Sequence, residues 1–437
     1  MPHPMSDPTP DFTPDPTPDL MTSNNPTPPT SAGRSRHRWI VSAGAAGAIA
    51  AVLAGCARDA PQDTMQPAGE NSQRIFDLSW PIFLIAGIVG VIVFVTIGFV
   101  VFRYKDRGQT MPEQTHGKPA LEIMLTIIPA VILIGVGIPT VSTIFKLAKT
   151  SDTQCVINVT GQQWWWEYDY PVQDDCGGVA ITKPIITSGQ LVIPTGTNVL
   201  LRITSRDVIH SYWIPKLNGK RDAVPGRVQT LRMEADQPGI YAGQCTEFCG
   251  LSHANMRMEA VGLYAADFQT WVANQLQDYT SPDDGTDAKA GETLFVSNCA
   301  YCHQVNGLTT GSGDAAKPVI ANPDQYVISG AAPNLTNLMT RNTFAGASWD
   351  LLTEACRDKV WNAAPQDFGK LYLAGVTPDC LNEVDLREWL RNAPGKKPMY
   401  SSDAQKEELG GKTSGMPNLH LTEDQIDLIV AYLLERQ

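Results

Sequence analysis

Soft metal ligands are concentrated between Cys245 and Met256. This stretch, Cys-Thr-Glu-Phe-Cys-Gly-Leu-Ser-His-Ala-Asn-Met, contains the thiols of Cys245 and Cys249, the imidazole of His253 and the thioether of Met256, and a further imidazole, His210, lies upstream. Thiolate, thioether and imidazole groups all suit copper. We therefore expect two bridging thiolates, one histidine for each metal, and weak axial ligands from Met256 and a backbone carbonyl to hold two copper ions. Such a centre passes single electrons with little rearrangement, because the protein fixes the ligands in advance.

Two other chemistries fit the same residues. Two cysteines and two histidines can hold a structural zinc ion, and the Cys-x3-Cys spacing lies within the zinc range, but zinc leaves Met256 without a role. In an oxidising compartment, Cys245 and Cys249 can instead form a disulfide. The thioether favours the two-copper interpretation over both alternatives.

A second redox centre is indicated by Cys299-Ala-Tyr-Cys302-His303, which has the attachment motif of c-type haem. Each cysteine of this motif forms a thioether to a haem vinyl group, and the histidine binds the iron. The alternatives are a redox-active Cys-x-x-Cys pair or half of a zinc site. The chain has no second Cys-x-x-Cys that would complete a zinc ribbon, so we predict haem.

The copper-ligand pattern resembles that of the dinuclear copper (CuA) centre in cytochrome c oxidase subunit II. Three further segments are similar to that family: Glu122–Pro129 resembles the start of its second membrane helix, Gly161–Tyr168 its aromatic segment where electrons arrive, and Asp222–Arg227 its loop facing subunit I. The resemblance implies a cupredoxin-like fold for the copper domain.

The resemblance also implies roles for three individual residues. Trp164 is by default a packing residue of a strand, and the resemblance adds electron transfer into the copper centre. Glu122 is by default a carboxylate at the membrane interface, and the resemblance places it near the mouth of a proton-uptake pathway into subunit I. For Glu247, the resemblance implies that the backbone carbonyl binds copper and that the carboxylate helps to hold a magnesium ion at the interface with subunit I.

The surroundings of the haem motif resemble a small class I cytochrome c. Ala332-Pro333-Asn-Leu resembles the segment whose proline carbonyl orients the proximal histidine. Gly-Met416-Pro-Asn-Leu resembles the distal methionine loop, and Thr422 is a favourable N-cap for the helix that follows, whose apolar residues recur at helical spacing. We predict Met416 as the distal iron ligand; the weaker candidates are Met399 and Met339.

The N-terminal region has the composition of a tail and a secretory signal. Residues 1–33 are rich in Pro, Thr, Asp and Ser and predict disorder. In residues 34–56, three arginines precede an uncharged stretch that ends Leu-Ala-Gly-Cys56, which is typical of a signal peptide and resembles a bacterial lipobox. We expect lipid on Cys56; the alternative is an uncleaved anchor helix.

Two long uncharged runs predict a membrane hairpin. After a polar linker (57–77), the segment 78–146 contains the uncharged runs Leu78–Phe102 and Ile123–Phe145, each long enough to span a bilayer of ~30 Å. Basic residues concentrate in the short loop between them, which places that loop in the cytoplasm. We therefore predict a multi-pass protein of the bacterial cell membrane, with both redox domains on the extracytoplasmic side.

The remainder of the chain divides into three parts. Residues 147–264 show short apolar runs punctuated by Gly and Pro, which predicts a β-sandwich with the metal ligands in loops at one end. Residues 265–287 read as a helix and an acidic linker, and residues 288–437 as the all-α haem domain. The chain is acidic, with 45 carboxylates against 33 Lys and Arg, and it has no basic stretch of the kind that nucleic acid requires.

Four of the nine cysteines are left after lipid, copper and haem are assigned. All four lie outside the cytoplasm in the predicted topology, where free thiols tend to be oxidised. Pairing within each domain predicts the disulfides Cys155–Cys176 and Cys356–Cys380. The alternative is buried free thiols, because cysteine is also a common small core residue.

Together these features predict subunit II of a respiratory cytochrome c oxidase fused to its own cytochrome c, as in the caa-type enzymes. Electrons would pass from haem c through CuA to subunit I, where oxygen is reduced to water and protons are pumped. The expected partners are subunits I and III, an upstream cytochrome c or bc complex, and membrane lipid. A nitric oxide reductase subunit and a free-standing membrane electron carrier remain alternatives, whereas a quinol oxidase subunit has no need for copper ligands.

Overall fold

The computed structural model describes residues 60–105, 108, 116–310, 317–318, 332–399 and 415–436. The predicted tail (1–33) and the signal and lipobox (34–56, with Cys56) lie outside the described residues. All described residues belong to one compact unit, Asp59–Gln437.

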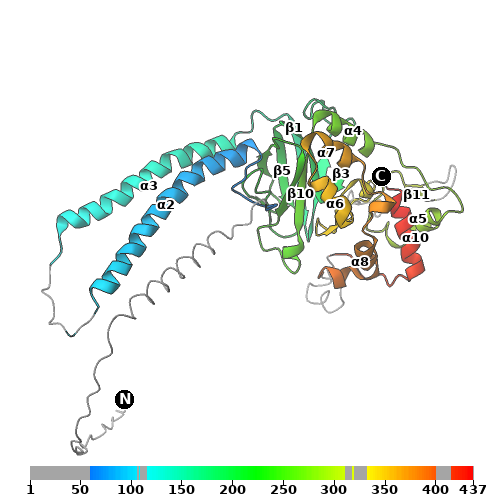
Figure 1. The fold of residues 1–437 in the computed structure, drawn as a ribbon. Coiled ribbons are helices and arrows are strands. Elements are labelled where there is room, and N and C mark those ends of the chain that lie inside the picture. The colour runs from blue at the N-terminus through cyan, green and yellow to red at the C-terminus, as the bar shows by residue number, and fades with distance from the viewer. Residues whose placement is uncertain are drawn as a thin grey trace, which may run out of the picture. The chain divides into compact units, whose positions relative to one another are not determined.

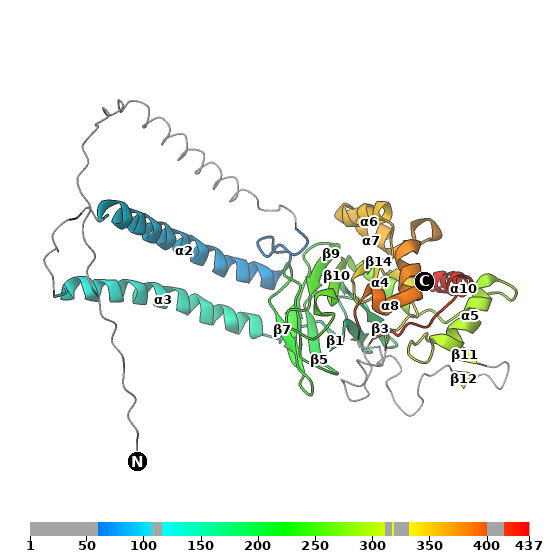
Figure 2. The same ribbon diagram turned by 90° about the horizontal axis from the view of Figure 1, so that it is seen from below.

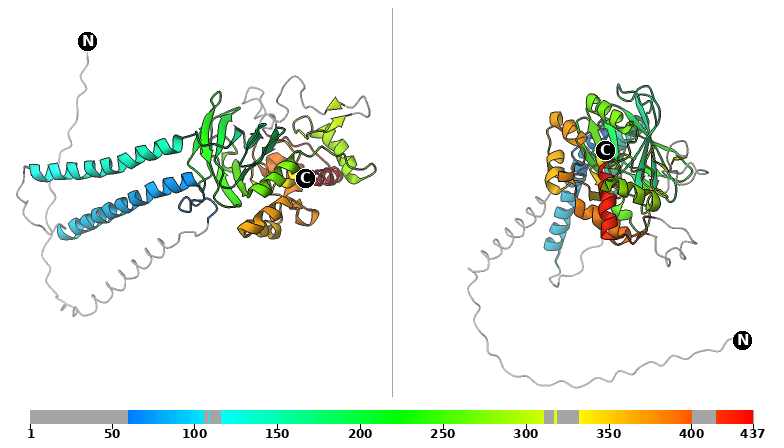
Figure 3. Two further views of the ribbon diagram at one scale, coloured as in Figure 1. Left: turned by 90° about the horizontal axis from the view of Figure 1, so that it is seen from above. Right: turned by 90° about the vertical axis from the view of Figure 1, so that its right-hand side faces the viewer.

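Two long apolar helices form the predicted hairpin. Helix α2 (Glu70–Arg103) and helix α3 (Pro119–Ala148) are both long and apolar enough to cross a membrane, with mean hydropathy 2.9 and 2.4. At 1.5 Å per residue they extend about 50 Å and 45 Å, which exceeds the ~30 Å of a bilayer core. They run side by side in Figures 1 and 2, and again as the blue and cyan helices in the left view of Figure 3. Their apolar side chains are exposed, as expected for a surface that faces lipid.

Helix α2 begins eight residues before the apolar run, inside the segment expected to be a linker. The Ser72 hydroxyl accepts a hydrogen bond from the Gly69 N–H (3.2 Å) and donates to the Lys216 carbonyl (2.6 Å). The Asn71 side chain donates to the Arg232 carbonyl (3.0 Å). The first turn is therefore stabilised by the sandwich domain, a tertiary contact that hydrophobic patterning cannot reveal.

The predicted β-sandwich is present. Its larger sheet has the strand order β3-β2-β1-β5-β8 and its smaller sheet the order β4-β10-β9, with β6–β7 as a separate ribbon. Strand β1 is parallel to β5, and β4 is parallel to β10. The strands are β1 (Cys155–Gln162), β2 (Trp165–Tyr170), β3 (Ile185–Ser188), β4 (Gln190–Pro194), β5 (Val199–Ser205), β6 (His210–Tyr212), β7 (Arg221–Ala223), β8 (Gln229–Met233), β9 (Gly239–Gln244) and β10 (Arg257–Leu263).

Alternating burial along the strands explains why this part of the chain forms two layers. In β5, every second residue from Val199 to Ser205 is buried, so one face of the strand lies in the core. Tyr170 of β2 reaches across the core, and its hydroxyl donates to the Val192 carbonyl of β4 (2.9 Å). Aromatic side chains thus fill the space between the sheets and hold them together.

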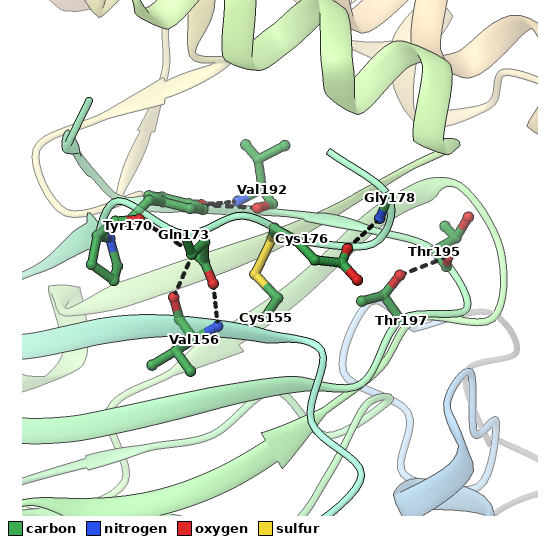
Figure 4. The surroundings of a disulfide bond; sticks show 11 residues. Cys155, Val156, Tyr170, Gln173, Cys176, Gly178, Val192, Thr195 and Thr197 are labelled. Carbon is green, nitrogen blue, oxygen red and sulfur yellow. Dashed lines mark hydrogen bonds between the residues drawn. A yellow bond between two sulfur atoms is a disulfide. The ribbon is translucent and has the colours of Figure 1, made fainter. Parts of the chain in front are cut away.

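Both predicted disulfides are confirmed. Cys155, at the start of β1, is bonded to Cys176, 21 residues further on. Figure 4 shows Gln173 beside this bond. Its side-chain oxygen accepts a hydrogen bond from the Val156 N–H (2.9 Å), and its side-chain nitrogen donates to the Val156 carbonyl (3.0 Å). The bridge therefore fixes the β2–β3 connection to the start of β1, the central strand of the larger sheet. In the haem domain, Cys356 is bonded to Cys380.

The C-terminal part is mainly helical, as predicted. Its helices are α5 (Asp287–Asn298), α6 (Glu354–Trp361), α7 (Pro365–Leu373), α8 (Glu383–Lys396) and α10 (Glu423–Leu434), and helix α4 (Ala265–Gln275) leads into it from the sandwich. Two short ladders, β11–β12 (Thr309–Thr310 with Lys317–Pro318) and β13–β14 (Thr343–Phe344 with Trp349–Asp350), supplement the expected all-α fold.

Helices α5 and α10 cross in close contact (Figure 2). A Cβ atom on Gly291 would lie 1.9 Å from the Leu428 carbonyl oxygen, so only glycine fits at this crossing. Phe295 and Tyr432 pack ring against ring, with centroids 5.1 Å apart. Helix α10 begins with the expected cap, since the Thr422 hydroxyl accepts a hydrogen bond from the Gln425 N–H. These two helices form the frame that carries the haem motif.

Candidate functional site: two adjoining redox centres

The predicted copper ligands come together in one sulfur-rich cluster. The Sγ atoms of Cys245 and Cys249 lie 3.8 Å apart. The Nδ1 atom of His210 faces Cys245 Sγ at 4.0 Å, and Nδ1 of His253 faces Cys249 Sγ at 3.5 Å. Met256 Sδ lies 3.8 Å from Cys249 Sγ. Each thiol thus has one imidazole nitrogen beside it.

The backbone carbonyl of Glu247 lies beside the Cys245 thiol, whereas Met256 lies beside the Cys249 thiol. The Glu247 carbonyl oxygen lies 3.3 Å from Cys245 Sγ, whereas the Glu247 carboxylate belongs to an exposed residue. Cys245 and Cys249 are both free cysteines, so the structure does not contain the alternative disulfide. The buried Met256 thioether beside the thiols is the soft donor that a zinc site would not require. The donor set therefore fits a pair of copper ions.

Three strands position these ligands. His210 opens β6, Cys245 directly follows β9, and Met256 directly precedes β10. The Cys245 N–H donates to the Met256 carbonyl (2.9 Å), which extends the β9–β10 ladder into the ligand loop. The Thr246 N–H donates to the Ser211 carbonyl (3.1 Å), which ties the loop to β6. Backbone hydrogen bonds on two sides thus hold the loop before any metal binds.

The electrostatics of the cluster favour one thiolate at neutral pH. Contact with Cys249 and with His210 lowers the pKa of Cys245, while contact with Cys245 and burial raise the pKa of Cys249. The two thiols therefore ionise in separate steps. Burial opposes protonation of His210, but hydrogen bonds to Asp207 and Cys245 outweigh it and raise the pKa of His210.

Asp207 was missed in the sequence analysis. Its Oδ1 lies 2.8 Å from His210 Nε2, on the side of the ring away from Cys245. A carboxylate in this place fixes the orientation and tautomer of a metal-binding histidine. The sequence did contain a signal for this role, because Asp207 lies three residues before the candidate ligand His210.

The haem motif lines a cavity of about 300 Å³, which is within the range of cofactor sites. Cys299 caps the end of α5, and Cys302 and His303 follow on the cavity wall. His303 Nδ1 lies 2.8 Å from the Pro333 carbonyl, as the cytochrome resemblance implies, which leaves Nε2 available to bind iron. Burial lowers the pKa of His303, so its imidazole is neutral, as iron ligation requires. These residues fit a covalently attached haem.

Two of the three candidate methionines line this cavity, namely Met399 and Met416. Met339 is fully buried and is not among the lining residues. The Met416 N–H donates to Met399 Sδ (3.0 Å), so the two residues lie side by side. Gly415 has φ +100°, a conformation in which a larger residue would be strained and would also meet Met399. Met416 remains our predicted ligand, with Met399 as its neighbour.

Trp164 joins the two centres. Its indole N–H donates to the Cys249 carbonyl (3.0 Å), as does the Gln163 amide (2.7 Å). Trp164 also lines the haem cavity and is only 2% exposed. One residue thus contacts the copper-ligand loop and also lines the haem cavity.

Glu122 lies on α3, away from both centres. The residue is exposed, and its carboxylate accepts a hydrogen bond from the Lys118 N–H (3.2 Å) at the start of the helix. The structure therefore places Glu122 at the end of the hairpin that joins α2 to α3. The contacts described here are those of a helix cap.

Comparison with known proteins gives a consistent picture over most of the chain. Residues 60–143 match the family model for the transmembrane domain of cytochrome c oxidase subunit II, residues 155–261 match its periplasmic domain, and residues 288–352 match cytochrome c. Subunit 2 of the cytochrome c oxidase of Bacillus sp. (strain PS3) is 32% identical over 89% of this chain and 95% of that protein. Subunit 2 from Alkalihalophilus pseudofirmus is 33% identical, over 64% and 81% respectively. The solved periplasmic domain of subunit II from Bradyrhizobium japonicum is 27% identical over 29% of this chain and 96% of that structure, with a TM-score of 0.26.

Proposed function

Since the chain belongs to the cytochrome c oxidase subunit II family and carries a C-terminal cytochrome c domain, we propose that it relays electrons from its own haem c to a CuA centre and on to subunit I. It is a subunit of a haem–copper terminal oxidase. Oxygen reduction to water and coupled proton pumping take place in subunit I, which this chain does not contain. Because the haem domain is fused to the copper domain, the electron donor is always present at a high local concentration. The copper domain therefore does not depend on a diffusional encounter with a separate donor.

The observation that carries this proposal is the place of Trp164. Trp164 is one of the residues that line the cavity of Cys299, Cys302 and His303, and its indole N–H donates to the carbonyl of Cys249. Haem c and two copper ions, when bound, would supply one-electron carriers next to this residue. Burial of Trp164 excludes water between the two centres, which reduces the rearrangement that accompanies electron transfer.

We assign the remaining residues as follows. Cys299 and Cys302 attach the haem, His303 binds the iron through Nε2, and Met416 provides the distal thioether. The copper pair is held by the ligands Cys245, Cys249, His210, His253, Met256 and the Glu247 carbonyl.

The outer parts of the proposal concern the partners and the membrane. We assign the exposed Glu247 carboxylate to a magnesium ion at the interface with subunit I, and Glu122 to the vicinity of its proton-uptake pathway. The haem and copper domains lie on the extracytoplasmic side of a bacterial membrane, anchored by α2 and α3 and by lipid on Cys56. Subunit III completes the assembly, and an upstream cytochrome c or bc complex reduces the haem domain.

One optical and metal analysis of the detergent-purified complex tests this function. We expect one covalently attached haem and two coppers in this chain, a near-infrared band from the copper pair, and a-type haem in the accompanying subunit. Zinc in place of copper would refute the copper assignment. A purified chain with haem c but no a-type haem would indicate a free-standing carrier instead.

A further inference from the structure

The two redox domains meet along a defined surface, which we call the interdomain interface and which joins residues 155–264 to residues 341–398. At its centre lies Lys397, which is only 3% exposed. The Lys397 ammonium donates to the carbonyl of Trp164 (2.8 Å) in the copper domain and to that of Ala345 (2.7 Å) in the haem domain. A single side chain thus bonds the backbone of both domains.

The haem-domain partner of Lys397 is an unusual turn. Ala345, Gly346 and Ala347 all have positive φ (54°, 74° and 53°), a conformation that alanine rarely adopts. Non-glycine residues persist in this region only where the surroundings hold them. Lys397 bonds the first carbonyl of the turn, and the Arg257 N–H of the copper domain bonds the second, at Gly346 (3.0 Å).

The turn is also in direct contact with the Trp164 backbone. A Cβ atom on Gly346 would lie 2.5 Å from the Trp164 carbonyl oxygen, so the close approach requires glycine. Trp164, Gly346 and Lys397 all line the haem cavity. Any shift of this turn would therefore change how the haem domain contacts Trp164.

Burying an ammonium is costly unless its hydrogen bonds are replaced. Here two backbone carbonyls, one from each domain, replace them. Lys396, the preceding residue, is different: its ammonium pairs with the carboxylates of Asp385 (2.5 Å) and Glu388 (2.6 Å), both within helix α8. Lys397 thus bonds both domains, whereas Lys396 contacts only side chains of the haem domain.

We propose that Lys397 is a positioning residue for electron transfer between the two centres. By holding the 345–347 turn on the Trp164 carbonyl, it fixes the contact through which one electron leaves the reduced haem and reduces the copper pair, with no bond made or broken. This inference rests on the proposed function and adds to it a residue that bonds the two domains to each other beside Trp164.

The test compares Lys397→Leu with Lys396→Leu in the purified oxidase complex. Each variant loses one ammonium and keeps an apolar side chain without a metal-binding atom. Haem c is reduced by a light pulse from a ruthenium complex, and its reoxidation is followed together with reduction of the copper band. Hydrogen exchange of the Arg257 amide, which donates across the interdomain interface, reports the contact itself.

We expect Lys397→Leu to slow electron transfer about tenfold or more and to speed exchange at Arg257 by a similar factor, because two hydrogen bonds that join the domains are lost. The covalent attachment of haem and the copper content should stay unchanged, the rates are compared after correction for any change in the measured potentials, and Lys396→Leu should match the wild type. Equal electron-transfer rates in the two variants would overturn the inference, as would a slower rate with unchanged exchange at Arg257.

A second variant covers the case in which Lys397→Leu does not assemble. The Ser348 hydroxyl donates to the Asn255 carbonyl across the same interface, so Ser348→Ala should also speed exchange at Arg257 and slow electron transfer. An unchanged rate and unchanged exchange in that variant would count against the inference. If the wild-type complex itself passes no electron from haem to copper, the proposed function fails instead.

Discussion

The buried carboxyl group of Glu259 should make the interdomain interface sensitive to pH. Glu259 lies on β10, and its carboxylate accepts a hydrogen bond from the Gln190 amide (2.7 Å). The side-chain oxygen of Gln190 accepts two hydrogen bonds from the haem domain. They are donated by the Asn342 N–H and the Tyr372 hydroxyl (both 3.1 Å). Burial raises the pKa of Glu259 from 4.5 to about 7. The negative charge of Asp350 also raises this pKa, whereas the hydrogen bond from Gln190 lowers it.

The size and sign of the effect follow from this pKa. A carboxyl group whose pKa is higher in the folded state stabilises that state below pH 4.5, and this contribution is lost as the pH rises through about 7. The full loss is about 3 kcal/mol, of which about 2.5 kcal/mol falls between pH 5 and pH 8. The free energy of opening the interface around Glu259 should therefore decrease over this range.

The assay is hydrogen exchange at the Asn342 amide between pH 5 and pH 8, corrected for the intrinsic pH dependence of exchange. In the wild type, the opening free energy should fall by about 2.5 kcal/mol. Glu259→Gln keeps the shape but cannot ionise, so its opening free energy should vary much less with pH. Glu354→Gln serves as control, since the Glu354 side chain is 84% exposed. An equal pH dependence in wild type and Glu259→Gln would refute the reasoning.

Three further predictions concern the individual centres. Replacing both Cys155 and Cys176 by Ala should destabilise the sandwich by about 3 kcal/mol, because the bridge closes a loop of 21 residues; chemical denaturation followed by the copper absorption measures this, and an unchanged midpoint would contradict it. Met416→Ala should leave haem covalently attached and lower its reduction potential, as judged by potentiometric titration, whereas an unchanged potential would point to Met399 or another ligand instead. Asp207→Asn should weaken copper binding about 10- to 100-fold, because the His210 ring loses its orienting carboxylate; competition with a chelator tests this, and wild-type affinity would show that Asp207 is dispensable.

Local spacing was sufficient to predict the chemistry of both centres. Cys245, Cys249, His253 and Met256 lie within one loop, so their order in the chain already limits where their side chains can meet. The haem motif is equally local, since Cys299, Cys302 and His303 lie within five residues at the end of one helix. Two uncharged runs likewise predicted the hairpin, because a helix that crosses a bilayer must be apolar along its length.

Contacts between residues far apart in the chain could not be predicted in this way. Helix α2 starts at Glu70 because the sandwich bonds its first turn, and the Trp164 indole reaches a carbonyl 85 residues away. Lys397 bonds Trp164 across 233 residues. Nothing in the sequence around Lys397 distinguishes it from Lys396.

These contacts escape sequence analysis because the hydrogen-bond partners of a buried group are the residues that the fold places next to it. Ligand type and spacing are properties of a segment, so the sequence by itself determined which metals and cofactors the chain suits. The approach of the haem cavity to Trp164 depends on the fit of two separately folded surfaces, including a turn with three positive φ angles. Only the tertiary structure decided that one buried lysine side chain would bond both surfaces.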